Sequence, residues 1–398
     1  MDSPARTVSA LALLALALGQ AAAQTTNLVA SHFSGNLYSL SYTASGGGAG
    51  RLAQTASQRA GGTWPAWLTY DGASRTLYTV DEANWVGPVF TEFKVAADGK
   101  LTKGAASPKS GGELHSTLYG GQDGKGFIAG AQYENSGVIS FKLPLSQNAQ
   151  PVSKLTFTMS GPGPVPSRQN KPHLHSVFPD PTGRFLLAAD LGADLIRVFS
   201  INPTSGVLTS CANIASGRGD GPRHGAFWTK NGATVLYVTN ELSNSVSAYT
   251  ASYPSSPSGG CLGLTRTQTM SSLGPGKAAP AGAKAAEVRV RDDFVYVSNR
   301  NDQTFGSRQD AIATYAVGAG GALTFVENVN SRSYFPRTFE INRAGDLVAV
   351  GGQTSSNVAV LSRNVTSGRI GGLVATLNVG SAGTVNNEDG LSHVVWIE

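Results

Sequence analysis

The feature that most constrains the fold is a segment of about 50 to 59 residues that recurs seven times in the chain. Each unit consists of an apolar strand, a polar loop and a second strand of alternating polarity, and several units add a glycine-containing turn and a further strand, as in ADGKLTKGA and PTSGVLTSC. The repeated segments begin at Asn27, Leu77, Phe127, Phe185, Val235, Phe294 and Leu347. Repeats of this length without helical periodicity predict an all-β fold, a seven-bladed β-propeller.

The ends of the repeat predict how the propeller closes. Most units also have a strand before the quoted segment, such as HSVFPDPTG before Phe185 and RHGAFWTKNG before Val235. The first unit lacks this strand, whereas the chain ends in an unassigned one, SHVVWIE. We therefore expect the C-terminal strand to complete the N-terminal blade, because a closed ring leaves no sheet edge exposed.

The N-terminus has the pattern of a secretory signal peptide. Arg6 precedes an apolar run, and the small residues Ala21, Ala22 and Ala23 follow it. This predicts a signal peptide at residues 1–23 and one propeller domain at residues 24–398. No segment is long and apolar enough for a membrane helix, so we expect a secreted, extracellular protein without membrane contact.

Composition narrows the partners and the redox chemistry. The formal net charge of +5 is spread along the chain without a basic cluster, so nucleic acid is not expected as a partner. The two cysteines, Cys211 and Cys261, form either one disulfide or two buried thiols. Asn364 begins an Asn-Val-Thr sequon and is a candidate glycosylation site. A closed propeller needs no partner, so we expect a monomer.

Polar residues gather at one position of the repeat. If the strand before each repeat segment is innermost, its first residues line one mouth of the central channel. Five of the six histidines fall there, and the loop positions opposite are also polar. The residues at these positions include Trp64, His115, His173, His175, Arg223, His224, Glu287, Arg337, His393, Asp81, Glu82, Gln132, Asp190, Glu241, Arg300 and Gln353. The pattern predicts a polar funnel of mixed charge that binds a small molecule, with arginines for anions and His or Glu for proton transfer.

Four segments resemble a known family. They are PHLHSVFPDPTGRFLLAADLGADLIRVFSI, GPRHGAFWTKNGATVLYVTNELSNSVSAYT, VYVSNR and PRTFEINRAGDLVAVGGQTSSNVAVL. They are similar to the seven-bladed lactonases, which include bacterial 6-phosphogluconolactonase and fungal carboxy-cis,cis-muconate lactonizing enzyme. The resemblance extends over the mature chain, is strongest from Lys171 to Leu361, and favours a secreted fungal member of the family.

The resemblance implies a site without metal or other cofactor, made of a histidine, two arginines and a glutamate at the channel mouth. By motif, the catalytic residues are His175, Arg223, Glu241 and Arg300. The expected substrate-binding residues are His115, His173, Asp190, Arg337, Gln353 and Trp85. A loop tryptophan such as Trp85 is suited to stacking on a sugar ring.

Alternatives remain for several of these residues. His173 and His175 could bind a metal, but no HxxxH or cysteine partner is evident. A structural role suits His173 better, and catalysis suits His175. Arg223 and Arg300 could instead be inter-blade ion-pair partners of Glu241.

The expected reaction is hydrolysis of a sugar lactone. Arg223 and Arg300 would stabilise negative charge on the carbonyl oxygen, and His175 or Glu241 would take a proton from water. No nucleophile elbow of the G-x-S-x-G type is present, so no covalent intermediate is required. Secretion favours unphosphorylated aldonolactones such as gluconolactone and cellobionolactone. The alternatives are a muconate-type cycloisomerase and a non-catalytic propeller that binds carbohydrate or protein.

Overall fold

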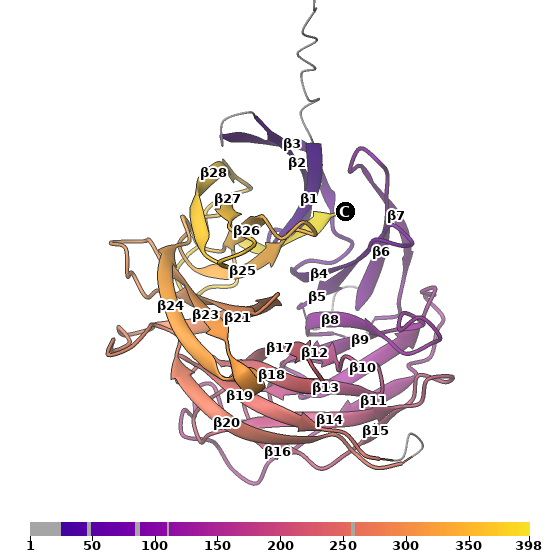
Figure 1. Ribbon diagram of the computed structural model, residues 1–398. Coiled ribbons are helices and arrows are strands. Elements are labelled where there is room, and N and C mark those ends of the chain that lie inside the picture. The colour runs from indigo at the N-terminus through magenta and orange to yellow at the C-terminus, as the bar shows by residue number, and fades with distance from the viewer. Residues whose placement is uncertain (1–24, 46–48, 84–87, 110, 256–258) are drawn as a thin grey trace, which may run out of the picture.

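Seven antiparallel sheets surround a central axis in the computed structural model, which describes residues 25–45, 49–83, 88–109, 111–255 and 259–398 (Figure 1). Each sheet is one blade, and we number the blades from 1 to 7 along the chain. The predicted seven-bladed propeller is therefore confirmed. The expected signal peptide at residues 1–23 lies outside the described residues. Among the described residues, no helix is long and apolar enough to cross a membrane.

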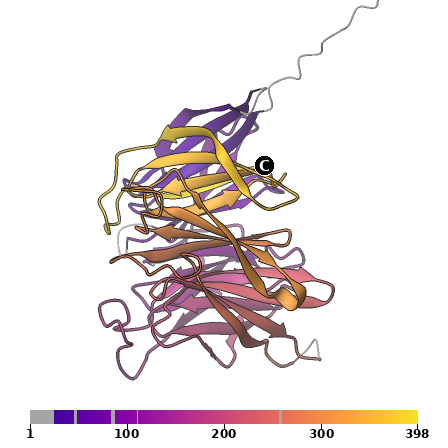
Figure 2. The ribbon, with the colours of Figure 1, turned by 60° about the vertical axis from the view of Figure 1, so that its left-hand side comes forward.

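Blade 1 contains both ends of the described chain. Its strands, from the axis outwards, are β29 (Leu391–Ile397), β1 (Thr25–His32), β2 (Asn36–Ala44) and β3 (Gly50–Arg59). β29 pairs antiparallel with β1, so that Asn27 lies opposite Ile397 and Ser31 opposite His393. The C-terminal strand thus completes the N-terminal blade, as the repeat predicted, and the ends of the ring lie side by side (Figures 1 and 2).

Blades 2 to 4 follow in chain order. The strands of blade 2 are β4 (Pro65–Asp71), β5 (Thr76–Asp81), β6 (Phe90–Val95) and β7 (Leu101–Ala106). Those of blade 3 are β8 (Glu113–Tyr119), β9 (Phe127–Gln132), β10 (Gly137–Lys142) and β11 (Ser153–Thr156). Those of blade 4 are β12 (Leu174–Pro179), β13 (Phe185–Asp190), β14 (Leu195–Ile201), β15 (Leu208–Ser210) and the short β16 (Ile214–Ala215), which also pairs with β14.

Blades 5 to 7 repeat the same order. The strands of blade 5 are β17 (Pro222–Lys230), β18 (Ala233–Asn240), β19 (Ser245–Ser252) and β20 (Gly263–Ser271). Those of blade 6 are β21 (Lys284–Arg291), β22 (Phe294–Arg300), β23 (Ala311–Val317) and β24 (Leu323–Asn330), with a short 3-10 turn, η1 (Ala319–Gly321), before β24. Those of blade 7 are β25 (Pro336–Ile341), β26 (Leu347–Gly352), β27 (Asn357–Arg363) and β28 (Ile370–Asn378).

The core lies between the blades. The second strand of a blade is covered on both faces, which is why a segment such as Phe185–Asp190 is apolar almost throughout and fully buried. The outermost strands alternate or are exposed, as in β20. Seven clusters of buried apolar residues each join two neighbouring blades; Phe127 of blade 3, for example, packs with Leu186 and Phe199 of blade 4.

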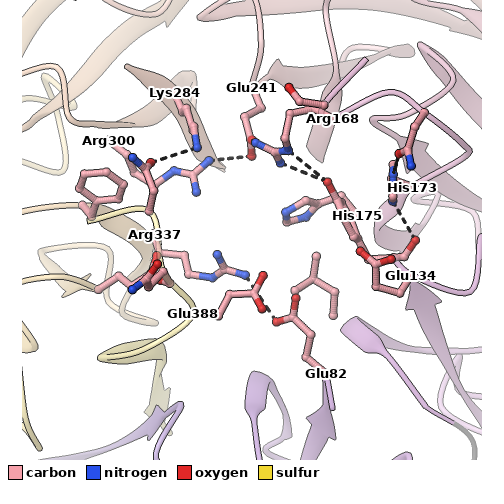
Figure 3. Close-up of a pocket in the computed structure, with 18 of the residues that line it drawn as sticks. Glu82, Glu134, Arg168, His173, His175, Glu241, Lys284, Arg300, Arg337 and Glu388 are labelled. Atoms are coloured by element: carbon pink, nitrogen blue, oxygen red, sulfur yellow. Dashed lines mark hydrogen bonds and ion pairs between the residues drawn. The ribbon is translucent and has the colours of Figure 1, made fainter. Parts of the chain in front are cut away.

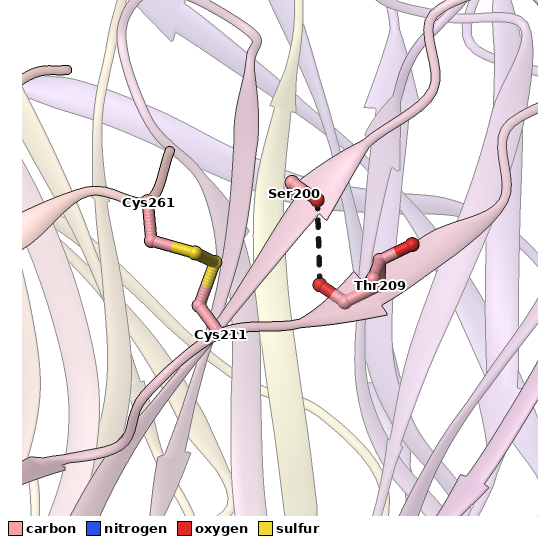
Figure 4. Close-up of a disulfide and its surroundings, with 4 residues drawn as sticks. All are labelled: Ser200, Thr209, Cys211 and Cys261. Carbon is pink, nitrogen blue, oxygen red and sulfur yellow. Dashed lines mark hydrogen bonds between the residues drawn. A yellow bond between two sulfur atoms is a disulfide. The ribbon is translucent and has the colours of Figure 1, made fainter. Parts of the chain in front are cut away.

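A disulfide joins the outer parts of blades 4 and 5. Cys211 and Cys261 are bonded, with their Cα atoms 5.9 Å apart, and Cys211 follows β15 (Figure 4). Of the two possibilities left by the sequence, the structure shows the disulfide. The bond crosses a blade interface that also contains apolar packing and a hydrogen bond from Oγ of Ser176 to the carbonyl oxygen of Arg223.

Candidate active site

A cavity of about 410 Å³ lies at one mouth of the central channel (Figure 3). It is lined by the first residues of inner strands, by residues at the ends of second strands, and by two loops. The polar lining residues are Glu82, Tyr133, Glu134, Ser167, Arg168, Asn170, Lys171, His173, His175, Glu241, Lys284, Arg300, Arg337, Gln353, Asn386, Asn387 and Glu388. Five basic side chains and four carboxyl groups therefore face one cavity, in agreement with a polar funnel of mixed charge.

A β-bulge near the start of each inner strand takes at least one residue out of the paired ladder, and in several blades this residue is polar. In β12 the pairing with β13 skips from Leu174 to Ser176 and leaves His175 without a partner in the ladder. The same irregularity leaves out Arg223 in β17 and Arg337 in β25, and it leaves out Leu114 in β8. Bulges turn side chains away from the regular alternation of a strand. We call these unpaired positions the bulge residues.

A second layer of side chains fills the channel beneath the cavity. It consists of residues immediately after the bulges, including Trp67, His115 and His224, together with His393. The ring centroid of Trp67 lies 4.1 Å from the ring centroid of His115 and 3.8 Å from that of His393. The ring centroid of His224 in turn lies 5.1 Å from that of His175, which is a bulge residue of the layer above.

The two layers correct two expectations. The sequence placed five histidines at a single structural position, but the bulges divide them into an upper position that faces the cavity and a lower one. His115 belongs to the lower layer and does not line the cavity, so it is not placed to bind substrate there. His224 lies in the same layer, where its Nδ1 is 3.1 Å from Oε1 of Glu287. We call His115, His175, His224 and His393 the channel histidines.

Glu241 is the centre of a buried ion-pair cluster. Its side chain is 1% exposed; Oε1 lies 2.6 Å from Nη1 of Arg168, and Oε2 lies 2.6 Å from Nη2 of Arg300 and 3.1 Å from Nε of Arg223. Burial by itself raises the pKa of Glu241, but Arg168, Arg300 and Arg223 outweigh it and hold this pKa well below the ordinary value. Glu241 is therefore a carboxylate held by three arginines, and it is a weak base.

Arg223 lies below the cavity lining. It is 1% exposed, and besides Glu241 it donates from Nη1 to the carbonyl oxygen of Ala286 at 2.9 Å. Arg223 thus makes the inter-blade ion pair that was the alternative to catalysis. Arg300 makes the same kind of pair but does line the cavity, and its Nε has no hydrogen-bond partner among the described residues.

His175 faces the cavity as a neutral imidazole. Burial, followed by the positive charge of Arg223 and the neighbouring His224, holds the pKa of His175 well below 6.5. Its Nδ1 is buried and has no hydrogen-bond partner within the described part of the chain. A neutral imidazole with no competing acid or base bonded to it is free to accept a proton from a molecule in the cavity.

His173 lines the same cavity but is held on both ring nitrogens. Nδ1 lies 3.1 Å from the carbonyl oxygen of Tyr133 and Nε2 lies 2.8 Å from Oδ1 of Asn170, and the ring stacks on that of Tyr133. This arrangement fits the structural role considered for His173. Among the described residues, no group of three or more His, Cys, Asp or Glu side chains is arranged to hold a metal ion.

Asp190 and Trp85 are not placed at the cavity by the structure. Asp190 is 0% exposed and does not line the cavity; it accepts hydrogen bonds from the backbone N–H groups of His173 and Ala193 and forms an ion pair with Arg197. The structure therefore does not bring Asp190 together with the other predicted site residues, and its hydrogen bonds hold the loop that leads into β12. Trp85 lies outside the described residues.

Gln353 and Arg337 line the cavity as predicted. Gln353 donates from Nε2 to the carbonyl oxygen of Asn387 at 2.9 Å and so fixes the loop between β28 and β29 over the cavity. Arg337 points into the cavity beside Glu82, whose Oε2 is 4.0 Å from Nη2 of Arg337 (Figure 3).

Several charged residues of the cavity were not among the predicted site residues. Arg168 comes from the loop between β11 and β12, Lys284 begins β21, and Glu388 comes from the loop before β29. The two loops have no counterpart at a fixed position of the repeat. Lys284 does have one, since it pairs with Arg300 at the start of an inner strand as Pro336 pairs with Gly352. Glu82 follows β5 and belongs to the loop positions that the repeat marked as polar, but the pattern assigned it no role.

The amino-acid sequence is similar to a family of known proteins. Residues 26–387 match the model of a family described as lactonase, 7-bladed beta-propeller. The chain is 28% identical over 313 residues to a protein of Arthroderma benhamiae named "Probable 6-phosphogluconolactonase", covering 77% of this chain and 75% of that protein. It is 30% identical over 255 residues to 6-phosphogluconolactonase of Bacillus subtilis, covering 64% of this chain and 67% of that protein.

A solved structure has the same fold. It is that of a periplasmic gluconolactonase of Pseudomonas aeruginosa, with a TM-score of 0.73 and 24% sequence identity, covering 94% of this chain and 99% of that one. The resemblance at this level of identity concerns the arrangement of the blades.

Proposed function

The chain belongs to the seven-bladed β-propeller lactonase family, and from this premise we propose that it is an extracellular, monomeric enzyme that hydrolyses unphosphorylated aldonolactones, such as gluconolactone and cellobionolactone, without a metal ion. The observation that carries the proposal is the neutral imidazole of His175, which faces a cavity lined by Arg300 and Arg337. This combination supplies a base for water and cations for a developing oxyanion.

His175 is the base in this proposal. It takes a proton from the water that attacks the lactone carbonyl carbon, and it is suited to this because its imidazole is neutral and its Nδ1 is unpartnered. Glu241, the other candidate, is a poorer base because Arg168, Arg223 and Arg300 already hold its carboxylate. Glu241 is then a positioning residue that holds Arg300 and Arg168 at the cavity wall.

Arg300 and Arg337 stabilise the negative charge that forms on the carbonyl oxygen. Both line the cavity, and Arg300 retains an unpartnered Nε–H. Preorganised cations in a site with little water lower the barrier of acyl transfer by several kcal/mol in other enzymes, about 3–4 for a single donor. Arg223, which is buried below, contributes through Glu241 and not by contact with substrate.

Two features support the choice of an unphosphorylated substrate outside the cell. The N-terminal sequence has the pattern of a signal peptide, and Cys211 and Cys261 form a disulfide, which is typical of oxidising compartments. A phosphorylated lactone is the second candidate, since Arg168, Lys171 and Lys284 add positive charge at the cavity and two relatives are named 6-phosphogluconolactonase.

The test is a pH-stat assay of glucono-1,5-lactone, cellobiono-1,5-lactone and 6-phosphoglucono-1,5-lactone, each corrected for spontaneous opening and measured with and without a chelator. We expect turnover of the first two, unchanged by the chelator. His175→Gln should lower kcat about 10²- to 10⁴-fold. His32→Gln is the control, because His32 lies outside the channel and its Nε2 is 2.9 Å from the carbonyl oxygen of Ser381.

Each other result changes the proposal in a defined way. A tenfold or greater preference for the phosphorylated lactone selects the second candidate. Loss of turnover with the chelator contradicts the metal-independent mechanism. No turnover of any lactone by folded wild-type protein contradicts the function itself.

A further inference from the structure

A pair of carboxyl groups on one wall of the cavity has no part in the reaction as described so far. Glu82 and Glu388 lie together beside Arg337, on the opposite side of the cavity from Glu241 and Lys284 (Figure 3). Glu82 is 8% exposed, and its Oε2 is buried without a hydrogen-bond partner among the described residues. A buried polar atom without a partner is costly unless a ligand completes it.

The two glutamates are held in place from different directions. Glu82 directly follows β5, a fully buried strand. Glu388 belongs to the exposed loop before β29, and the two residues before it are anchored: Nζ of Lys284 lies 3.2 Å from Oδ1 of Asn386, and Gln353 donates to the carbonyl oxygen of Asn387. Both glutamates therefore belong to the wall of the cavity.

The charges around Glu82 favour its protonated form. Burial is the largest influence and the carboxylate of Glu388 the next, and together they raise the pKa of Glu82 to about 8. Arg337 and Arg223 act in the opposite direction but do not cancel these effects. At neutral pH the cavity therefore contains a neutral carboxylic acid on one wall and the ionised Glu241 on the other. Two carboxyl groups held in different protonation states commonly have different roles in one reaction.

We propose that Glu82 is a further catalytic residue, an acid that donates a proton to the ring oxygen of the lactone as the bond between that oxygen and the carbonyl carbon breaks. This inference rests on the proposed lactonase function. An aliphatic alkoxide is a strong base, so its departure from the tetrahedral intermediate is faster when it is protonated as it leaves.

The proton balance closes over one turnover. His175 accepts a proton from water, whose oxygen bonds to the carbonyl carbon. Glu82 gives its proton to the ring oxygen, which leaves as the hydroxyl group of the aldonic acid. The imidazolium of His175 then returns a proton to the carboxylate of Glu82 through solvent. Lactone and water are consumed, one aldonic acid is formed, and no other reactant is needed.

The test uses the leaving group. Glu82→Gln keeps the size of the side chain but removes its acid, and it is compared with wild type on glucono-1,5-lactone and on dihydrocoumarin, whose phenoxide leaves without protonation. We expect kcat for the aldonolactone to fall 10²-fold or more and kcat for the aryl lactone to fall less than about fivefold. For wild type, activity on the aldonolactone should decline above pH about 8, and this decline should be absent for the aryl lactone.

Glu113→Gln is the matched control. Glu113 is also a buried glutamate, with a pKa raised to about 8 by burial, but it does not line the cavity and its Oε1 accepts a hydrogen bond from Gln132. We expect this variant to keep the wild-type pH profile. Glu388→Gln should move the alkaline decline to lower pH, because it removes a negative charge that favours protonated Glu82.

Several outcomes would overturn the inference without touching the lactonase function. One is Glu82→Gln with wild-type activity on glucono-1,5-lactone, which would assign the proton donor to the imidazolium of His175. Another is an equal loss on both lactones. If Glu82→Gln does not fold, the wild-type profiles decide alone: an alkaline decline that is the same for both leaving groups contradicts the role of Glu82. Absence of turnover by wild type is a different result and contradicts the proposed function.

Discussion

Neutralising Glu241 should destabilise the protein more than any other single charge change at the cavity. Glu241→Gln keeps the shape of the side chain but leaves Arg168, Arg223 and Arg300 around an uncharged amide. Arg223 is 1% exposed and the side chain of Arg300 is 7% exposed, so neither charge has compensating contact with water. Removing one member of a buried ion pair typically costs about 3–5 kcal/mol, because the remaining charge stays buried.

This free energy translates into a measurable shift of the melting temperature. Unfolding entropy is about 2.1 cal/mol/K per residue, so for roughly 370 folded residues a loss of 1 kcal/mol lowers Tm by about 1.3 °C. We therefore expect Glu241→Gln to lower Tm by about 4–6 °C. The double variant with Arg223→Gln should recover part of this loss, because it removes one of the unpaired charges. Calorimetry measures the Tm of wild type and of both variants, and urea unfolding gives their free energies of unfolding as a second measure.

Glu134→Gln is the control for this prediction. Glu134 is also at the cavity and also has an ion-pair partner, Lys171, but both side chains are at least 40% exposed. Exposed ion pairs contribute about 0–1 kcal/mol, so this variant should melt within about 1 °C of wild type. A Glu241→Gln protein that melts together with Glu134→Gln would refute the reasoning, since burial of the cluster would then have no energetic consequence.

Three further predictions concern the whole propeller. Deletion of residues 391–398 removes β29, so the variant should fail to close the ring and show no cooperative melting transition. Replacing Cys211 and Cys261 by serine should cost about 4 kcal/mol in urea unfolding, from the entropy of a loop closed over 50 residues; a loss below 1 kcal/mol would contradict this estimate. The channel histidines have pKa values well below 6.5, so the unfolded chain takes up protons that the folded one does not, and stability should fall as the pH decreases below about 6.5. Buried carboxyl groups whose pKa values are raised, including Glu82 and Glu113, oppose this effect and make the net loss smaller; a urea midpoint that stays constant from pH 6.5 to 5.5 would contradict the expected loss.

The fold could be predicted because its periodicity is long and its ends are complementary. Seven units predicted seven blades, and the unpaired strand at each end predicted the pairing of β1 with β29. Within the site, His175, Arg300 and Arg337 line the cavity, and the sequence pointed to them because they occupy positions that recur in every blade.

The errors have one physical origin, the geometry at the start of the inner strands. Adjacent residues such as Arg223 and His224 look equivalent in a repeat alignment, but the bulge gives them different depths in the channel. His115 was therefore assigned to the cavity although it lies beneath it. Arg168 and Glu388 could not be found because they come from loops between blades, whose course over the cavity depends on tertiary contacts such as that between Gln353 and Asn387.

The bulge residues have a consequence for how such a protein can change over time. Where a bulge residue lines the cavity, as His175 and Arg337 do, it stands outside the ladder of paired residues, so a substitution there alters the chemistry of the mouth with little effect on strand pairing. Residues as different as Ala66, Leu114, His175 and Arg337 occupy this position in four of the blades. At these places the side chain that determines reactivity is separate from the strand pairing that determines folding, and a new specificity can arise by exchange at a few equivalent positions around one axis.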